Sequence, residues 1–499
     1  MSKENILRIG DVSDNGQVTI VDEDKLCYIV LSENNNAKGL RTISKALLAE
    51  FVQYFKSHSG ASSKDAREAL SGKSDIDKFE YGYNSTLTVM ANMVLGRIGV
   101  QHTKVVVPKS STANLNVTAS YRPYITAIKS KPFLLLAGIS GTGKSRIVRE
   151  LACACWEEGS KEYKDPKPKN FEMVQVKPNW HDSSELIGYV SRVSGSPVFV
   201  AGDFLKFVAK AWENPEVPYF LCLDEMNLAP VEQYFAEYLS VVESRKADEN
   251  GVITADPILK KCDEQWFFDL TAQLTSDDDV RARFNKDGIC IPQNLIVVGT
   301  VNMDETTFSF SRKVLDRAMT IEMNEVDLYG GLDDRHEQIG KLEAGNLIGT
   351  AVEGVDVYRD HQEVCDTALK YLEAINEKLD GSPFKVAYRT RNEFLLYVVN
   401  NLPYNKDKDG NEIPQQEVIA RALDEITSMK ILSRIEGDSD KIGNLLEELR
   451  KTVSEQLNGI SGKEYSEKKN DGEKVYSVSL AKLEEMEGRL DSGYTSFWS

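Results

Sequence analysis

The chain has 499 residues, of which 41% are hydrophobic and 28% are charged. This composition is typical of globular proteins and excludes a wholly disordered, collagen-like or coiled-coil chain. At roughly 100–200 residues per domain, the length predicts two to four domains. The formal net charge of −18 excludes a protein that is basic over its whole surface, although it allows a local basic face.

The seven cysteines are scattered and include no CxxC pair, which is typical of free thiols in a reducing compartment. The first residues contain no apolar segment of the kind found in signal peptides. The longest apolar runs, such as 132–138, are far shorter than the ~20 residues that a membrane helix needs. We therefore expect a soluble, cytoplasmic protein without membrane contact.

Residues 1–115 differ from the rest of the chain in their charge. They contain 14 Lys and Arg residues and 13 Asp and Glu residues, so the negative charge belongs almost entirely to the remainder. Residues 16–33 alternate like two short strands, and 44–55 and 84–98 have helical periodicity. We predict a separate α+β N-terminal module, followed by a polar linker at 109–120.

From 121 to 325, short apolar runs alternate with helical segments. Such runs predict strands buried on both faces, and their alternation with helices is typical of a parallel sheet in an α/β core. The runs are 133–137, 171–176, 219–223, 295–298 and 319–323. A long polar insert at 246–293 interrupts this core, and 326–499 is predicted to be mainly helical.

The segment 138–145 matches the phosphate-binding pattern GxxxxGK[ST] in full. It consists of Gly138, Ile139, Ser140, Gly141, Thr142, Gly143, Lys144 and Ser145. An apolar run precedes it and a helical segment follows it, which is the context that the pattern requires. We expect the glycines to let backbone N–H groups surround an anion, Lys144 to meet the β- and γ-phosphates, and the Ser145 hydroxyl to ligate Mg²⁺.

Polar residues follow two later apolar runs. Asp224 is predicted to hold Mg²⁺ through water, and Glu225 to activate the water that attacks the γ-phosphate. The run that begins at Leu295 brings Asn302 to the same carboxyl edge, where open α/β sheets bind ligands. There its neutral amide can hold the attacking water. The alternative is that Asn302 is a turn residue that caps the next element.

Two arginines, Arg312 and Arg317, come after Asn302. An arginine beside a transferring phosphoryl group stabilises the charge of the transition state. The alternative for either arginine is a surface ion pair with Asp316. Earlier in the chain, Trp180 is a candidate for stacking on a nucleic-acid base, or otherwise an aromatic residue of the core or an interface.

The segments GISGTGKS, LCLDEMN, VVGTVNMDETT and VLDRA together resemble the AAA+ NTPases, in the branch of the dynein-related, MoxR and McrB ATPases. The resemblance covers about 121–400 and is greatest to the McrB family, the GTP-driven motors of modification-dependent (type IV) restriction systems. Asn302 matches the asparagine of that family and Glu305 stands for its aspartate. Thr306 replaces the arginine that follows in the family.

The resemblance implies a five-stranded parallel sheet in the order 5-1-4-3-2, followed by a helical lid. It implies a hexameric ring in which Arg317, or alternatively Arg312, is an arginine finger for the nucleotide of the neighbouring subunit. Arg389 lies where such proteins carry a nucleotide-binding sensor arginine, with Arg391 as the alternate. An ordinary basic pair at a helix start is the other interpretation of these two residues.

The implied function is a motor that hydrolyses ATP or GTP with Mg²⁺ and drives DNA translocation or restriction. Residues 1–115 would recognise DNA or another target, and a separate McrC-like nuclease subunit would cut, since we find no nuclease pattern in this chain. The alternative is a MoxR- or dynein-like ATPase that remodels a protein client. The nearly neutral N-terminal module is compatible with both.

Overall fold

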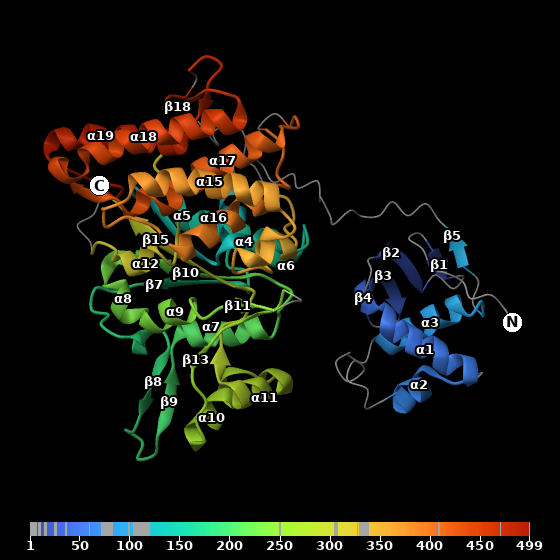
Figure 1. The fold of residues 1–499 in the computed structure, drawn as a ribbon. Coiled ribbons are helices and arrows are strands. Elements are labelled where there is room, and N and C mark those ends of the chain that lie inside the picture. The colour runs from blue at the N-terminus through green and yellow to red at the C-terminus, as the bar shows by residue number, and fades with distance from the viewer. Residues whose placement is uncertain are drawn as a thin grey trace. The chain divides into compact units, whose positions relative to one another are not determined.

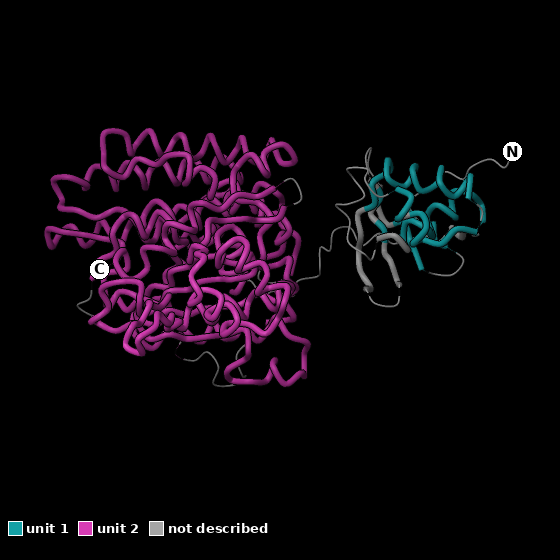
Figure 2. The backbone as a smooth tube through the Cα atoms, turned by 90° about the horizontal axis from the view of Figure 1, so that it is seen from below, with its two compact units in different colours: residues 1–114 teal, residues 115–499 magenta. Residues whose placement is uncertain are grey.

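The chain divides into two units, residues 1–114 and 115–499, which are described separately (Figure 2). A computed structural model describes residues 7, 11–13, 17–23, 27–34, 37–58, 60–70, 83–97, 100–102, 120–248, 251–303, 308–326, 328, 339–407, 410–469 and 471–498. Of the linker predicted at 109–120, all but Ser120 lies outside these residues.

The first unit contains an antiparallel sheet with the strand order β4-β3-β2-β1-β5. Its strands are β1 (Asp11–Ser13), β2 (Val18–Glu23), β3 (Cys27–Asn34), β4 (Ala37–Ser44) and β5 (Val100–His102). Its helices are α1 (Lys45–Ser57), α2 (Ser63–Leu70) and α3 (Tyr83–Val94). Val18 and Val30 of the sheet share one core with Phe51 and Met90 of the helices. The unit is therefore α+β.

The second unit is built on a five-stranded parallel sheet with the order β16-β6-β15-β10-β7. Its strands are β6 (Phe133–Gly138), β7 (Phe171–Gln175), β10 (Tyr219–Asp224), β15 (Leu295–Asn302) and β16 (Met319–Glu322). Numbered along the chain from one to five, these strands lie in the order 5-1-4-3-2. Because all of them run in the same direction, their carboxyl ends form one edge of the sheet and their amino ends form the other.

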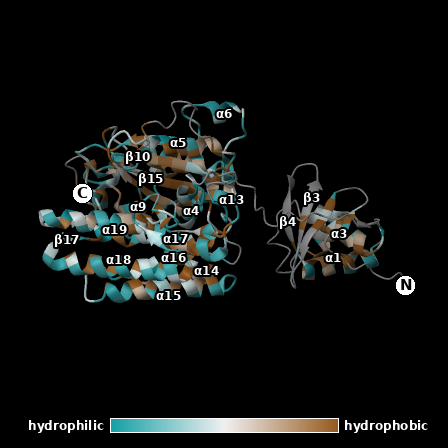
Figure 3. Cartoon of the chain, turned by 90° about the horizontal axis from the view of Figure 1, so that it is seen from above, coloured by the Kyte–Doolittle hydropathy of each residue, from teal (hydrophilic) through white to brown (hydrophobic). Residues whose placement is uncertain are grey.

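Alternate residues of the strands enter two separate cores, as expected for a sheet covered on both faces. Leu134 and Leu136 pack in the core on the side of α4 (Arg122–Ser130) and α5 (Lys144–Ala154). Phe133 and Leu135 pack in the core on the side of α7 (Asp203–Trp212), α8 (Val231–Tyr234) and α9 (Ala236–Val241). Figure 1 shows the sheet between these layers, and Figure 3 shows the hydrophobic residues of β10 and β15 inside.

Two further pieces are added to this α/β core. The hairpin of β8 (Gly188–Ser191) and β9 (Val198–Ala201) carries Phe199, whose ring stacks on Trp266 with centroids 5.4 Å apart. Trp266 belongs to the insert predicted at 246–293, which is folded in its described part. The insert contains β11 (Lys246–Ala247), β12 (Ile253–Thr254), β13 (Pro257–Leu259), α10 (Gln265–Leu274), α11 (Asp278–Asp287) and β14 (Ile289–Cys290).

The C-terminal part is a layer of helices above the sheet (Figure 1). Its helices are α13 (Ala344–Leu347), α14 (Val355–Tyr358), α15 (Gln362–Lys378), α16 (Tyr388–Asn401), α17 (Gln415–Lys430), α18 (Ser439–Ser461) and α19 (Val478–Arg489). Short strand pairs β17 (Glu436–Asp438) with β20 (Tyr494–Ser496) and β18 (Tyr465–Ser466) with β19 (Val475–Tyr476) complete it. The second unit also contains the short α-helices α6 (Lys161–Lys164) and α12 (Arg312–Leu315).

Two predictions made from composition can be compared with the second unit. Its six cysteines are free thiols, as the absence of paired spacing predicts. Within the described parts of the chain, we find no helix whose length and apolar character would let it span a membrane.

Candidate active site

The predicted phosphate-binding loop joins β6 to α5. Gly141 and Gly143 have φ angles of 86° and 85°, a left-handed conformation that favours glycine. The ammonium group of Lys144 is buried and donates hydrogen bonds to the carbonyl oxygens of Gly138 (2.9 Å) and Ile139 (2.7 Å). The loop therefore wraps around its own lysine at the N-terminus of α5, where an anion is attracted.

The start of the loop is held by a residue that sequence reasoning missed. The backbone N–H of Ile139 donates to Oδ1 of Asn324, at 2.9 Å. A Cβ atom on Gly138 would lie 2.6 Å from the carbonyl oxygen of Met323, so only glycine fits there. Asn324 follows β16 and belongs to no recognised pattern, and only the pairing of β16 with β6 brings it to the loop.

Asp224, at the end of β10, joins the loop to the next strand. Its Oδ1 accepts hydrogen bonds from the hydroxyl groups of Ser145 (2.8 Å) and Thr300 (2.8 Å). Ser145 and Asp224 are thus close enough to ligate one hard cation such as Mg²⁺, which prefers oxygen donors. Thr300 was not predicted as a site residue; it lies two residues beyond the apolar run 295–298.

Glu225 has an unusual backbone conformation. Its φ of 54° is the one positive φ of a non-glycine residue in the described chain, a strained conformation that is found at functional sites. Its N–H donates to Thr300 Oγ1 at 3.0 Å, and its Oε1 accepts from Nδ2 of Asn302 at 3.2 Å. The neighbouring strand β15 therefore holds Glu225 twice, at its backbone through Thr300 and at its carboxylate through Asn302.

Asn302 is the last residue of β15, in register with Gly138 of β6. The strand is longer than the apolar run from which it is predicted, so Asn302 is delivered by the sheet and does not lie in a turn. Lys144, Ser145, Asp224, Glu225 and Asn302 are thus brought together at the carboxyl edge. Glu305, the other residue of the predicted segment, lies outside the described residues.

Arg317 lies at the opposite edge of the same sheet. It precedes β16, whose first residue Met319 is in register with Leu134 near the amino end of β6. The six extended residues of β6 span roughly 20 Å, which separates Arg317 from the phosphate-binding loop of its own subunit. An arginine side chain is too short to bridge this distance.

Arg317 and Arg389 meet at one carboxylate. Nη2 of Arg317 lies 2.9 Å from Oε2 of Glu243, and Arg389 forms an ion pair with the other oxygen of Glu243. Arg389 is the second residue of α16, and because it shares Glu243 with Arg317 it also lies at the amino edge. The alternative considered for Arg317, a surface ion pair with Asp316, is not the pair that forms: Arg317 pairs with Glu243, and Asp316 pairs with Arg434 at 2.9 Å.

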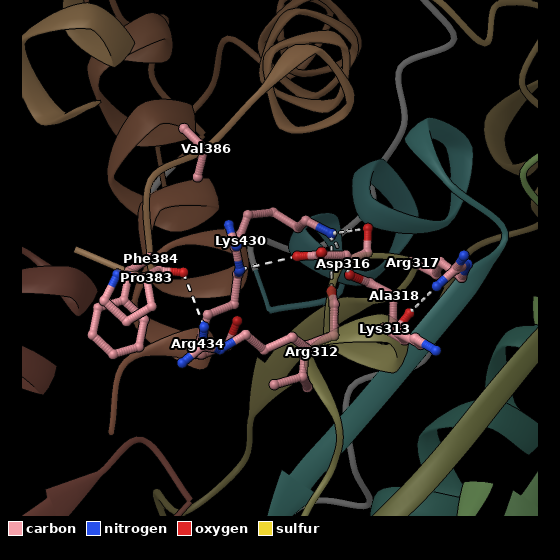
Figure 4. Close-up of polar contacts among 12 residues, drawn as sticks. Arg312, Lys313, Asp316, Arg317, Ala318, Pro383, Phe384, Val386, Lys430 and Arg434 are labelled. Atoms are coloured by element: carbon pink, nitrogen blue, oxygen red, sulfur yellow. Dashed lines mark hydrogen bonds and ion pairs between the residues drawn. The ribbon is translucent and has the colours of Figure 1, made fainter. Parts of the chain in front are cut away.

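The other two candidate arginines make local contacts with the lid. Arg312 donates to the carbonyl oxygen of Pro383 at 3.0 Å, and its guanidinium lies 4.9 Å from the centroid of the Phe384 ring (Figure 4). Arg391 donates to the side chain of its neighbour Asn392. Both arginines therefore have structural contacts that account for their positions.

A buried lysine of the lid fixes the segment that carries Arg317. Lys430, at the end of α17, donates to the carbonyl oxygens of Leu315 (3.1 Å), Asp316 (3.0 Å) and Ala318 (2.8 Å) at the C-terminal end of α12 (Figure 4). It also forms an ion pair with Glu393 of α16, at 2.8 Å. Burial lowers the pKa of Lys430 to about 8, against the opposing effect of Glu393. Neither Lys430 nor Glu393 belongs to a recognised sequence pattern.

Trp180, the candidate for stacking on a base, belongs to a core. Its side chain is buried, and its ring packs edge to face on Tyr234 with the centroids 5.3 Å apart. The interpretation as a core aromatic is therefore the correct one.

Comparison with known proteins finds similarity over part of the chain. The chain is similar to the Type IV methyl-directed restriction enzyme EcoKMcrB subunit of Escherichia coli, with 26% identity over 203 residues. The match covers 41% of this chain and 36% of that relative, and thus spans about a third of its length. Residues 348–494 match a family model described as a domain of unknown function (DUF8727). The likeness supports a McrB-like AAA+ relationship and suggests a nucleoside triphosphatase.

Proposed function

We propose that this chain is a McrB-like AAA+ motor that hydrolyses ATP or GTP. The observation that carries the proposal is the convergence of Lys144, Asp224 and Glu225 at the carboxyl edge of one sheet. Asp224 is bonded to Ser145, the neighbour of Lys144 in the loop, and Thr300 is bonded to both Asp224 and Glu225. Lysine, hydroxyl and carboxylate groups around a helix N-terminus are the set that phosphoryl transfer from a nucleotide requires.

Each group has a role in the proposed reaction. Lys144 would bind the β- and γ-phosphates, and Ser145 and Asp224 would hold Mg²⁺, which neutralises charge on the phosphates. Glu225 would take the proton from the attacking water. The amide of Asn302, which donates to Glu225 at 3.2 Å, would orient that carboxylate and the water.

We further propose that the motor works as a ring, for which the arginines provide the argument. Arg317 and Arg389 lie at the amino edge and pair with Glu243, a strand length away from the phosphate-binding loop of their own subunit. They can stabilise charge on a nucleotide only if that nucleotide is bound by an adjacent copy, as in a hexamer. The role predicted for Arg389 is accordingly proposed here for the neighbouring site.

The biological substrate follows from the likeness to the restriction subunit and is part of the proposal. We propose that the ring acts on DNA together with a separate, McrC-like nuclease subunit, and that residues 1–115 recognise the DNA. These residues form their own α+β unit, as expected for a recognition module.

A paired hydrolysis assay tests the proposal. The chain is incubated with Mg²⁺ and either ATP or GTP, with and without methylated DNA, and phosphate release is measured. We expect hydrolysis of one or both nucleotides, and we expect Lys144→Ala to abolish nucleotide binding and turnover because the phosphates lose their cationic partner. Lys161→Ala, an exposed lysine outside the site, is the matched control.

The outcomes separate the parts of the proposal. Stimulation by methylated DNA would support a restriction motor, whereas hydrolysis that DNA does not change would favour an ATPase that remodels a protein client. Phosphate release no greater than that of Lys144→Ala would overturn the assignment of the site.

A further inference from the structure

Glu243 lies just after α9, and its side chain contacts both Arg317 and Arg389. Its Oε2 is 2.9 Å from Nη2 of Arg317, and its Oε1 pairs with Nη2 of Arg389. The three residues come from segments that are far apart in the sequence: the end of α9, the residues before β16, and the start of α16. Their meeting at one point is therefore a product of the tertiary fold.

The side chains of Arg317 and Arg389 differ in their exposure to solvent. Arg317 is mostly buried, with 17% of its side chain exposed, and its Nη1 donates to the carbonyl oxygen of Lys313 at 2.6 Å (Figure 4). Arg389 is 41% exposed. Arg317 is thus fixed by its bond to Lys313 of α12, and Arg389 is more exposed to solvent. Glu243 pairs with the Nη2 group of each arginine.

The arrangement resembles the binding of a phosphoryl group. Two like charges this close repel each other, and the carboxylate offsets this repulsion by giving one oxygen to each arginine. A terminal phosphate presents the same pattern with more negative charge, and charge-assisted contacts of arginine to phosphate are among the strong ones. Arg389 is 41% exposed and Glu243 is 26% exposed, so solvent reaches this cluster. A terminal phosphate carries more negative charge than the carboxylate and can therefore compete with Glu243 for both guanidinium groups.

We propose that Glu243 is a positioning residue that holds Arg317 and Arg389 as a pair and yields both to the terminal phosphate of a nucleotide bound by an adjacent copy. The inference rests on the proposed function, because it requires hydrolysis that depends on assembly. Beyond the proposed function, it makes Glu243 a competitor of the nucleotide for Arg317 and Arg389. Glu243 stays paired with both arginines until the nucleotide of a neighbouring subunit displaces it.

The test is the specific hydrolysis rate measured against protein concentration. Glu243→Gln keeps the shape of the side chain and removes its charge, so the arginines become available without competition. We expect the protein concentration at half-maximal rate to fall several-fold, with a plateau at least equal to that of the unchanged chain. Glu237→Gln, an exposed carboxylate on α9, is the matched control and should follow the unchanged chain.

A second background separates a positioning role from a merely structural one. In Arg389→Ala, one of the two groups that Glu243 holds is absent, so Glu243→Gln should shift the half-maximal concentration much less. A curve for Glu243→Gln that superimposes on the unchanged chain, or a lower plateau at the same half-maximal concentration, would overturn the inference. If the unchanged chain hydrolyses no more nucleotide than Lys144→Ala, the proposed function itself fails instead.

Discussion

The two edges of the parallel sheet in the second unit carry different kinds of polar site. At the carboxyl edge, Lys144 follows a strand within one short loop, and Asp224 and Glu225 directly end another. At the amino edge, Glu243, Arg317 and Arg389 come from three separate segments and are supported by the lid. In the proposed function, the carboxyl edge binds a nucleotide and the amino edge acts on the nucleotide of a neighbour.

The two edges also differ in what holds them. The carboxyl edge depends on backbone geometry, such as the positive φ angles of Gly141, Gly143 and Glu225. The amino edge depends on ion pairs and on Lys430, which binds three carbonyl oxygens around α12. Variants at the two edges should therefore fail in different ways, with loss of binding or chemistry at the first and loss of cooperation between subunits at the second.

The largest effect is expected for Arg317→Ala at the amino edge. Hydrolysis should fall by about 10³-fold or more, the range found for arginine fingers. Nucleotide affinity should stay unchanged, because Arg317 lies far from the loop of its own subunit. Steady-state hydrolysis and equilibrium binding of a labelled nucleotide measure the two quantities. Arg281→Ala, which removes an arginine paired only with Asp278 on α11, is the control and should change neither.

At the carboxyl edge, Glu225→Gln should separate chemistry from binding. The substitution removes the proton acceptor and keeps the contact to Asn302, so turnover should fall by at least about 100-fold while nucleotide stays bound and the ring stays assembled. Single-turnover hydrolysis and size-exclusion chromatography are the measurements, with Glu232→Gln on α8 as control. Near-normal turnover would show that another group activates the water.

The support of the amino edge by the lid is tested with Lys430→Met. The substitution leaves Glu393 with Lys131 as its remaining cationic partner and removes the donor from the carbonyl oxygens of Leu315, Asp316 and Ala318. Because buried acceptors without a donor are costly, the free energy of unfolding should fall by roughly 1–3 kcal/mol. Denaturant titration measures this change, and exposed Lys451→Met is the control. Hydrolysis should fall as α12 shifts, with nucleotide binding retained. An unchanged unfolding free energy would contradict the role given to Lys430.

The carboxyl edge is largely predictable from the sequence because its rules are local. The site residues are glycines in a loop, carboxylates at the end of one apolar run and an amide after another. Because the strands are parallel, all of these residues lie at the same edge of the sheet. Thr300 and Asn324 are exceptions, since each is recognised only by its partner, Asp224 in one case and Ile139 in the other.

The amino edge is not predictable in the same way. Arg317 and Arg389 are found through resemblance, but nothing in the spacing of Glu243 indicates that it joins them. In the sequence, Lys430 cannot be distinguished from other lysines at helix ends. Its role is visible only in the folded chain, where it bonds to the carbonyl oxygens around α12. In the first unit, the short strand β5 and helix α2 have weak local patterns, and they form through packing within that unit.

The most direct test of the difference between the edges is a mixing experiment with two inactive variants. Lys144→Ala cannot bind nucleotide but keeps its arginines, and Arg317→Ala binds nucleotide but lacks one of them. If the amino edge acts on the nucleotide of a neighbour, mixtures should recover part of the hydrolysis that neither variant has alone, with a maximum at intermediate ratios. Activity that stays at the level of the separate variants, in mixtures shown to co-assemble, would contradict this account.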